Sequence, residues 1–144
     1  MINDKKHRTA IGRTKLSLPA KFLSSQGLLT GRTIDIGSGR GFDSKALGLE
    51  QYDPHFSPEM PAGKFDTVMS NYVVNVLTDE EIPEFLDGIR AILNPGGKAY
   101  ISIRADVKKE GWTKIGTYQR NFELDLELMD TKSKKKYRMY VLEN

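Results

Sequence analysis

The stretch TIDIGSGRGF, from Thr33 to Phe42, constrains the fold of this chain more than any other feature. Its β-branched residues predict a buried strand, and that strand runs directly into Gly37, Gly39 and Gly41. A glycine-rich turn after a strand is typical of a cofactor loop, because glycine lets the backbone approach a ligand closely. The spacing here is G-x-G-x-G, which is one residue shorter than the G-x-G-x-x-G of dinucleotide-binding enzymes. The loop therefore favours a cofactor other than a dinucleotide.

The alternation of helix and strand signals around this loop predicts a parallel α/β sheet. We expect strands in GRTIDIG, LEQYD, KFDTVMSN and KAYISIR, and short helices after Ser17, a candidate N-cap, and over residues 42–47. The clearest helix lies within TDEEIPEFLDGIRAILNPGG, where Thr78 and Glu81 have capping-box spacing and Pro83 is expected to delay the regular helix. In such sheets ligands bind beyond the carboxyl ends of the strands.

Residues 105–144 follow a different pattern from the rest of the chain. From Phe122 to Leu128 apolar and acidic side chains alternate, and KYRMYVLE repeats the alternation after the polar turn DTKSKK. This period of two predicts a terminal antiparallel hairpin. We therefore expect one domain over residues 1–144, with a basic segment and short helix (1–30), a cofactor-binding core (31–104), and a loop followed by the hairpin (105–144).

The composition sets limits on the chemistry and on the compartment. A chain of 144 residues has the size of a single domain. It has no cysteine, which excludes disulfides, thiolate metal ligands and a cysteine nucleophile. The segment MINDKKHRTAIGR lacks the apolar region of a signal peptide, and no apolar run approaches the ~20 residues of a membrane span. We expect a soluble, cytoplasmic, monomeric protein that binds no metal.

Two acidic residues flank the glycine loop and narrow the choice of cofactor. Asp35 lies inside the predicted strand, where a carboxylate is costly unless it is hydrogen-bonded, and it would face a cationic or amine-bearing ligand. Asp53 ends the next strand, at a spacing suited to an acid that binds ribose hydroxyls. The two acids together suit S-adenosylmethionine, whose sulfonium and amino groups are positive. A tight strand-to-helix turn without a ligand is the alternative.

The order of TIDIGSGRG, YDP, KFDTVMSNYVVNVL and LNPGGKAYISI resembles class I S-adenosylmethionine-dependent methyltransferases over residues 30–104. With HRTAIGRTKLSLPAKFLSSQGLL, YDPHFSP and GTYQRNF, the chain is similar more narrowly to methyltransferases found beside bacterial DNA phosphorothioation genes. The resemblance implies a Rossmann-like core with a reduced parallel sheet that ends in an antiparallel hairpin. Only eleven residues separate Asp53 from Phe65, where the family usually has a helix, a strand and another helix. The resemblance therefore assigns no adenine contact.

The resemblance also implies roles for individual residues. Asp35 would hold the glycine loop at the methionine end of the cofactor, Asp53 would bind the ribose, and the residues that end KFDTVMSN would contact the methyl acceptor. Methyl transfer is an in-line displacement, so that positioning matters most and no universal base is needed. The implied cofactor-binding residues are Asp35, Gly37, Ser38, Gly39, Gly41, Asp53, Pro54 and Ser70, and the implied catalytic residues are Ser70, Asn71 and Tyr72.

The net charge of +3 is distributed unevenly along the chain. Residues 1–30 carry six basic side chains and one acidic one, whereas residues 31–104 carry seven basic and eleven acidic ones. Basic ends favour a polyanionic partner because Lys and Arg at phosphates release counterions, although a solvated lysine-rich turn is the alternative. We expect nucleic acid as the acceptor, with structured RNA favoured over DNA because a target-recognition region is missing. The expected phosphate-binding residues are Lys5, Lys6, Arg8, Arg13, Lys132, Lys134, Lys135 and Lys136, and the candidates for base stacking are Trp112, Tyr118 and Tyr137.

Three other functions stay open on the sequence alone. The chain could methylate a small molecule, could bind nucleic acid in a cofactor-dependent way without catalysis, or could be a dinucleotide oxidoreductase. The histidines His7 and His55 are candidate bases. Two chemistries lose support: pyrimidine C5 methylation needs a thiolate, and SNYVVN is not the Pro-Pro-aromatic turn of many amino-methyltransferases.

Overall fold

The computed structural model describes residues 14–106, 111–112, 118–119 and 123–144. Its main feature is a six-stranded sheet in the order β2-β1-β3-β4-β8-β7. Parallel pairs join β1–β2, β1–β3 and β3–β4, whereas β4–β8 and β7–β8 are antiparallel. The strands of this sheet are β1 (Thr33–Ile36), β2 (Glu50–Tyr52), β3 (Phe65–Asn71), β4 (Leu93–Arg104), β7 (Glu127–Leu128) and β8 (Tyr137–Glu143), and a separate ladder joins β5 (Gly111–Trp112) and β6 (Tyr118–Gln119).

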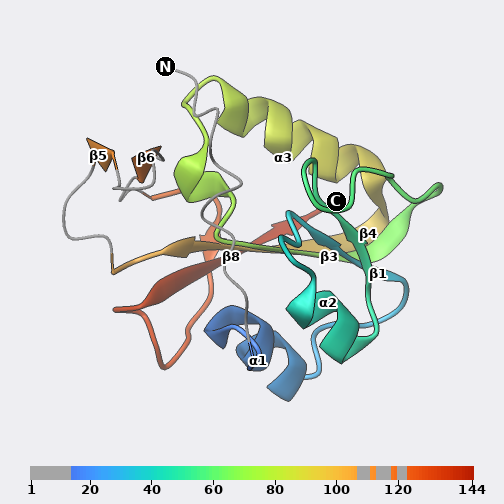
Figure 1. Cartoon of the computed structure of the whole chain (residues 1–144), viewed down its shortest axis with the longest axis horizontal. Helices are drawn as coiled ribbons and strands as arrows, with labels where there is room; N and C mark the ends of the chain where they lie inside the picture. The colour runs from blue at the N-terminus through green and yellow to red at the C-terminus, as the bar shows by residue number, and fades with distance from the viewer. Residues whose placement is uncertain (1–13, 107–110, 113–117, 120–122) are drawn as a thin grey trace.

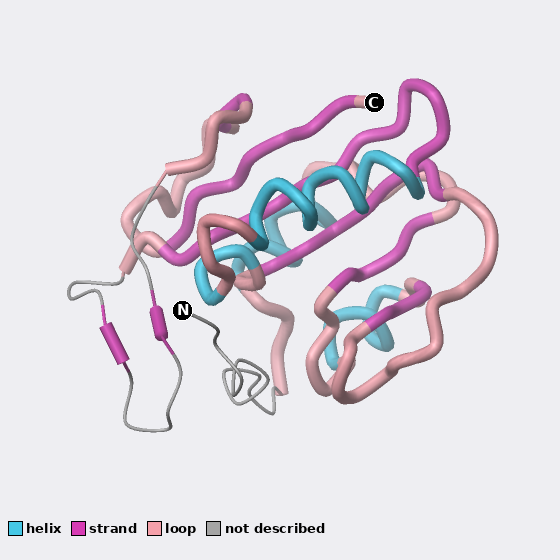
Figure 2. Tube along the Cα trace, turned by 90° about the horizontal axis from the view of Figure 1, so that it is seen from above, coloured by secondary structure: helices cyan, strands magenta, loops and turns pink. Residues whose placement is uncertain are grey.

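Helices cover both faces of the sheet. The helices α1 (Leu18–Ser25) and α2 (Phe42–Leu47) lie on one face, and α3 (Glu81–Ile92) and the short 3₁₀ helix η2 (Val74–Val76) lie on the other (Figure 1). Figure 2 shows α3 running along the strands that it covers. This three-layer arrangement confirms the predicted α/β class with its reduced parallel sheet and terminal antiparallel strands.

Capping hydrogen bonds mark the beginnings of α1 and α3. The Ser17 hydroxyl accepts a hydrogen bond from the Ala20 N–H at 3.3 Å, as expected of an N-cap. The Thr78 N–H donates to Glu81 Oε1 at 3.0 Å, and the Glu81 N–H donates to Thr78 Oγ1 at 3.2 Å, which confirms the capping box. The expected delay by Pro83 is wrong: α3 begins at Glu81, so Pro83 lies in the first turn, where a proline removes no intrahelical bond.

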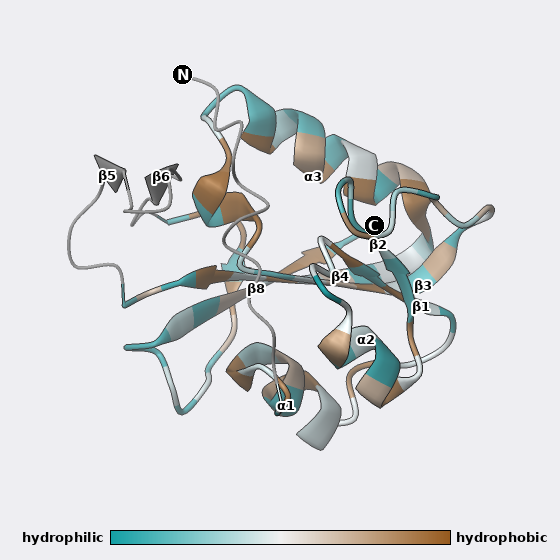
Figure 3. Ribbon diagram, in the orientation of Figure 1, coloured by the Kyte–Doolittle hydropathy of each residue, from teal (hydrophilic) through white to brown (hydrophobic). Residues whose placement is uncertain are grey.

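Two apolar clusters hold the layers together. The larger cluster joins α3 to the sheet through residues such as Ile34, Ile89 and Ile101, which are at most 2% exposed. The other cluster packs Leu23 of α1 against Met69 and other residues of the opposite face. Figure 3 shows the hydrophobic colour concentrated on η2 and on the central strands. Both faces of the central strands are therefore buried, as continuous apolar runs in parallel strands predict.

The terminal hairpin forms, but its first strand is shorter than its sequence pattern predicts. β8 matches KYRMYVLE closely, whereas β7 contains only Glu127 and Leu128. Leu124 and Leu126 pack partly buried against the larger cluster from outside any strand, and Leu128 is 50% exposed. Part of the alternating segment therefore packs its apolar side chains against the core without pairing as a strand.

The sheet ends at β2 because residues 53–64 connect β2 directly to β3. No further strand or helix lies in this connection, in agreement with the shortness of the segment after Asp53. Consequently the loop of residues 53–64, and no further strand, follows the edge strand β2, and Tyr52 of β2 lines the same cavity as Phe85 of α3. Among the described residues, none of the helices combines the length and the apolar character needed to cross a membrane.

Candidate functional site

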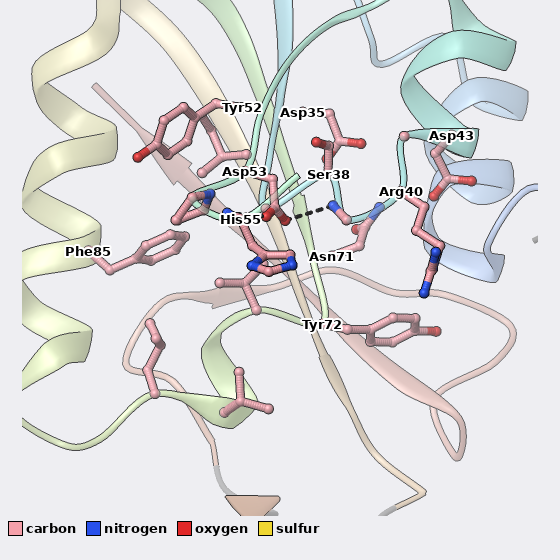
Figure 4. Close-up of a pocket in the computed structure, with 18 of the residues that line it drawn as sticks. Asp35, Ser38, Arg40, Asp43, Tyr52, Asp53, His55, Asn71, Tyr72 and Phe85 are labelled. Carbon is pink, nitrogen blue, oxygen red and sulfur yellow. Dashed lines mark hydrogen bonds between the residues drawn. The ribbon is translucent and has the colours of Figure 1, made fainter. Parts of the chain in front are cut away.

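The carboxyl ends of β1, β2 and β3 open into a cavity of about 780 Å³. The glycine loop Gly37–Gly41 borders it on one side, and the residues that follow β2 and β3 border it on others. Helix α3 contributes the opposite wall (Figure 4). This is the edge of the sheet at which the sequence predicts a ligand site.

The backbone of the glycine loop has a shape that side chains would prevent. Gly37, Gly39 and Gly41 have φ angles of 77°, 57° and 85°, in the left-handed region that favours glycine. A Cβ atom on Gly37 would overlap the Val73 side chain, and one on Gly41 would lie 2.6 Å from Gln51 Oε1. These three glycines are therefore required by the turn itself, and their backbone is left facing the cavity.

Asp53 fixes the loop and the turn after β2 at the same time. Its Oδ2 accepts a hydrogen bond from the Gly39 N–H at 2.8 Å, and its Oδ1 accepts from the N–H groups of His55 and Phe56 at 2.9 and 3.1 Å. The sequence interpretation gave the role of holding the loop to Asp35. In the structure Asp35 lies inside β1, two residues before the loop, whereas the carboxylate that is hydrogen-bonded to the loop belongs to Asp53, directly after the neighbouring strand β2.

Asp35 lines the cavity from the middle of β1 and is only 4% exposed. Burial, and to a smaller extent the nearby carboxylates of Asp43 and Asp53, raise the pKa of its carboxyl to about 8. Asp43, in the first turn of α2, is a cavity residue that the sequence interpretation missed. Its two carboxylate oxygens accept hydrogen bonds from the N–H and the hydroxyl of Ser17, at 2.9 and 2.7 Å. Three carboxylates from three elements therefore line one cavity.

The residues at the end of β3 divide into two that reach the cavity and one that does not. Asn71 and Tyr72 line it, whereas Ser70 is fully buried within the sheet and is not a lining residue. Asn71 Oδ1 accepts a hydrogen bond from the Ser102 hydroxyl at 2.8 Å, which orients the amide. Tyr72 has a φ of 63° and donates its N–H to the Ser102 carbonyl at 3.0 Å. Such a φ in a bulky residue is strained and is held here by its surroundings.

Two buried polar groups of the cavity lack a partner within the described part of the chain. The Ser38 hydroxyl and the Asn71 Nδ2 amide are both shielded from solvent and make no hydrogen bond there. Leaving such groups unsatisfied is costly, and a bound ligand that pairs with them would recover this free energy. The Ser38 hydroxyl and the Asn71 Nδ2 group could therefore each form a hydrogen bond with a molecule bound in the cavity.

The wall formed by α3 and by the turn after β2 was not predicted from the sequence. The lining residues of this part of the cavity include Tyr52, His55, Met60, Leu77 and Phe85. Pro54, an expected cofactor residue, lies among them. Nothing in the spacing of these residues indicates that they meet, because their proximity depends on how residues 53–64 cross toward β3.

The expected phosphate-binding residues are only partly described. Lys132, Lys134, Lys135 and Lys136 are exposed in the turn before β8, and Lys134 forms an ion pair with Asp130 at 2.6 Å. Tyr137 is 2% exposed, which contradicts base stacking and agrees with the alternative of hairpin packing. The N-terminal Lys5, Lys6, Arg8 and Arg13, the candidate base His7, and the side chains of Trp112 and Tyr118 lie outside the described residues.

The chain matches no protein-family model and no curated protein. Among solved structures, 1,6-didemethyltoxoflavin-N1-methyltransferase of Burkholderia thailandensis, with bound 1,6-didemethyltoxoflavin and S-adenosylhomocysteine, is similar with a TM-score of 0.64. It is 16% identical over 88% of this chain and 76% of that chain. DhpI, solved as an SAH complex, has a TM-score of 0.57 at 13% identity over 85% of each chain. A S-adenosylmethionine dependent methyltransferase from Mesorhizobium loti has a TM-score of 0.53 at 12% identity, over 87% of this chain and 98% of that one.

The chain has the class I methyltransferase fold. This conclusion confirms the fold that the sequence resemblance implied. Within the class I methyltransferase fold, the glycine loop, Asp53 and the end of β3 lie at one edge of the sheet and line one cavity. The donor set is also chemically suited to S-adenosylmethionine: three carboxylates match its positive groups, and the buried Ser38 and Asn71 groups have unused hydrogen-bonding capacity.

Proposed function

We propose that this protein is an S-adenosylmethionine-dependent methyltransferase. The observation that carries the proposal is the convergence of Asp35, the glycine loop and Asp53 on one cavity of a class I methyltransferase fold. A structural turn alone would not need two acids and an unpartnered buried hydroxyl beside it. A dinucleotide cofactor is disfavoured because its pyrophosphate would face three carboxylates.

Each part of the cavity suits one part of the donor. The glycine loop and Asp35 would hold the methionine end, where the ammonium group matches the acid. Asp53 would accept from a ribose hydroxyl through Oδ2, since its carboxylate is already oriented by three backbone N–H groups and Oδ2 accepts only one of them. Leu77 and Phe85 supply an apolar wall for the adenine, in place of the strand that this chain lacks.

The chemistry needs positioning more than it needs proton transfer. S-adenosylmethionine, when bound, supplies a methyl group on a positively charged sulfur. Asn71 would orient the acceptor through its Nδ2 group, because the bond from Ser102 fixes the plane of the amide. Tyr72, whose backbone is fixed by the bond to the Ser102 carbonyl, would border the acceptor from the neighbouring position.

We further propose that the acceptor is a nucleic acid, with structured RNA favoured. The support is the location of the basic turn: Tyr137 pairs with Arg104 at the carboxyl end of β4, so Lys132–Lys136 lie at the same edge of the sheet as the cavity. β8 is three strands from β1, about 14 Å at the usual strand spacing. A phosphate backbone held by this turn could therefore extend toward the acid-lined cavity, which itself repels phosphates.

Transfer to a small molecule is the second candidate. The cavity of about 780 Å³ has an apolar wall and lies within the usual size range of small-molecule sites, which favours this candidate independently of the basic turn. The similar enzyme of Burkholderia thailandensis is itself named for methylation of 1,6-didemethyltoxoflavin.

Transfer of a tritiated methyl group from S-adenosylmethionine tests the proposed activity. The protein is incubated with separate fractions of RNA, DNA, protein and metabolites, and the wild type is compared with Asp53→Ala. We expect label in RNA with the wild type and a loss of at least tenfold in the variant, because the oriented ribose contact is removed. Label in the metabolite fraction alone would favour the second candidate, and cofactor binding without transfer to any fraction would contradict catalysis.

Charge reversal of the basic turn tests the acceptor class. We expect Lys135→Glu combined with Lys136→Glu to weaken RNA binding at low salt and to reduce its salt dependence by about two ion equivalents. The matched control is Lys98→Glu, which reverses an exposed charge on β4 away from the carboxyl end. Unchanged RNA affinity and salt dependence in the double variant would refute the electrostatic contact.

A further inference from the structure

The three carboxylates of the cavity differ in how their charge is stabilised. Asp53 accepts hydrogen bonds from three backbone N–H groups, and Asp43 accepts two from Ser17. Asp35 is the most buried of the three, and within the described part of the chain no donor is hydrogen-bonded to its carboxyl. A buried carboxyl without donors disfavours its own ionisation, so burial raises the pKa of the Asp35 carboxyl.

The other charged groups that line the cavity do not stabilise the ionised form of Asp35. Glu81 and Glu84 of α3 add negative charge, and His55 follows β2. Arg40 is the one Lys or Arg among the described lining residues, and its guanidinium lies over the Phe56 ring, 5.3 Å from the ring centre. The elements packed around Asp35 therefore present mainly acids, together with the neutral groups of Ser17, Asn71 and Tyr72.

This arrangement makes the protonation state of Asp35 depend on the charge of what fills the cavity. The pKa of about 8 indicates that the carboxyl is mostly protonated at neutral pH in the absence of a cation. A cation placed against it stabilises the ionised form and lowers this pKa. Besides the carboxylate that both molecules carry, the methyl donor has a sulfonium and an ammonium group, whereas the product S-adenosylhomocysteine has only the ammonium group.

We propose that Asp35 distinguishes the methyl donor from its product by charge. In the empty cavity the carboxyl holds a proton. When the donor binds with its two cationic groups, the O–H bond breaks and the proton passes to solvent; when the sulfonium has become a neutral thioether, the carboxylate takes a proton back from solvent. The inference rests on the proposed function and adds a proton-linked preference of this residue for the donor over the product.

Isothermal titration calorimetry tests this proposal without turnover. The wild type is titrated at pH 7 with S-adenosylmethionine, with sinefungin, which carries an amine in place of the sulfonium, and with S-adenosylhomocysteine. Each titration is repeated in buffers of different ionisation enthalpy, so that the slope gives the number of protons released. We expect the two doubly cationic ligands to release up to about nine-tenths of a proton, and S-adenosylhomocysteine to release clearly less.

Two variants and one pH series complete the test. Asp35→Asn should release no proton with any of these ligands and should lose the preference for the cationic ones. Asp43→Asn should still release part of it, because Asp35 remains and only one of the neighbours that raise its pKa is removed. If Asp35→Asn does not fold, the wild type serves instead. Its affinity for sinefungin relative to S-adenosylhomocysteine should rise as the pH is raised toward about 8 and should level off above it.

The outcomes separate this proposal from the proposed function. Equal proton release for all three ligands, or release that survives in Asp35→Asn, would overturn the role of Asp35 while leaving the cofactor assignment intact. No measurable binding of any ligand would overturn both.

Discussion

At the scale of single residues, Gly37 illustrates how strongly the conformation of the glycine loop restricts its sequence. Its φ of 77° disfavours any side chain, and a Cβ atom there would overlap Val73. Gly48 has a similar φ of 68° but has no atom within 4 Å of where its Cβ would lie. The two positions therefore separate the backbone cost of a side chain from the steric cost at the site.

We expect Gly37→Ala to weaken S-adenosylhomocysteine binding at least tenfold and to lower the free energy of unfolding by more than Gly48→Ala does. Gly48→Ala should cost only the conformational term of about 1–2 kcal/mol and should leave binding unchanged. Calorimetry and urea unfolding measure the two effects. Equal losses in both variants would mean that the contact with Val73 carries no energy, and partial rescue of Gly37→Ala by Val73→Ala would identify that contact directly.

At the scale of secondary-structure elements, Ser17 joins α1 to α2. Its hydroxyl accepts from Ala20 at the start of α1 and also donates to Asp43 in α2, while its N–H donates to the same carboxylate. Because the residue is 2% exposed, these bonds are shielded from water. One side chain thus caps a helix and fixes the helix that begins directly after the glycine loop.

We expect Ser17→Ala to lower the free energy of unfolding by about 2 kcal/mol, which combines a lost N-cap with a lost bond to a charged group. Thr78→Ala is the matched control: it removes the cap of α3 but no link to the loop, and it should cost about 1 kcal/mol. Urea denaturation measures both. A cost for Ser17→Ala no larger than that for Thr78→Ala would show that the bond to Asp43 contributes nothing to stability.

At the scale of the whole molecule, Asp35 couples the stability of the fold to pH. Its pKa of about 8 lies above the value of ~3.9 for an aspartate in an unfolded chain, so the folded state keeps a proton that the unfolded state releases. The free energy of unfolding therefore falls as pH rises through this window, by up to about 1.4 kcal/mol per pH unit, and levels off above the folded pKa. Burial of Asp35 in the cavity thus lowers the stability of the fold at neutral pH.

We expect Asp35→Asn to remove this dependence. In the absence of cofactor, the difference in unfolding free energy between Asp35→Asn and the wild type should grow in favour of the variant from pH 5 to pH 8. Urea unfolding at these pH values measures it, and subtraction of the two curves cancels the contributions of exposed acids such as Glu50 and Asp66. A constant difference across this range would mean that Asp35 is ionised in the free protein.

Local signals in the sequence were sufficient to predict most elements of the fold and the glycine loop. The N-cap at Ser17, the helix over 42–47 and the Thr78–Glu81 capping box each depend on residues close together in the chain. The errors concern contacts that the topology creates. Ser70 was assigned to the site although it is fully buried and does not line the cavity, and the α3 wall with Phe85 was missed because residues 53–64 bring distant segments together.

The short connection between β2 and β3 makes this protein a convenient host for engineering. Residues 53–64 run over the surface, and Glu59, Gly63 and Lys64 are exposed there, so an inserted sequence would displace little of the core. The same segment also borders the cavity through His55 and Met60. A circularly permuted fluorescent protein grafted at residues 61–63 would therefore be attached to a wall of the ligand site, and the fold could serve as a compact genetically encoded sensor.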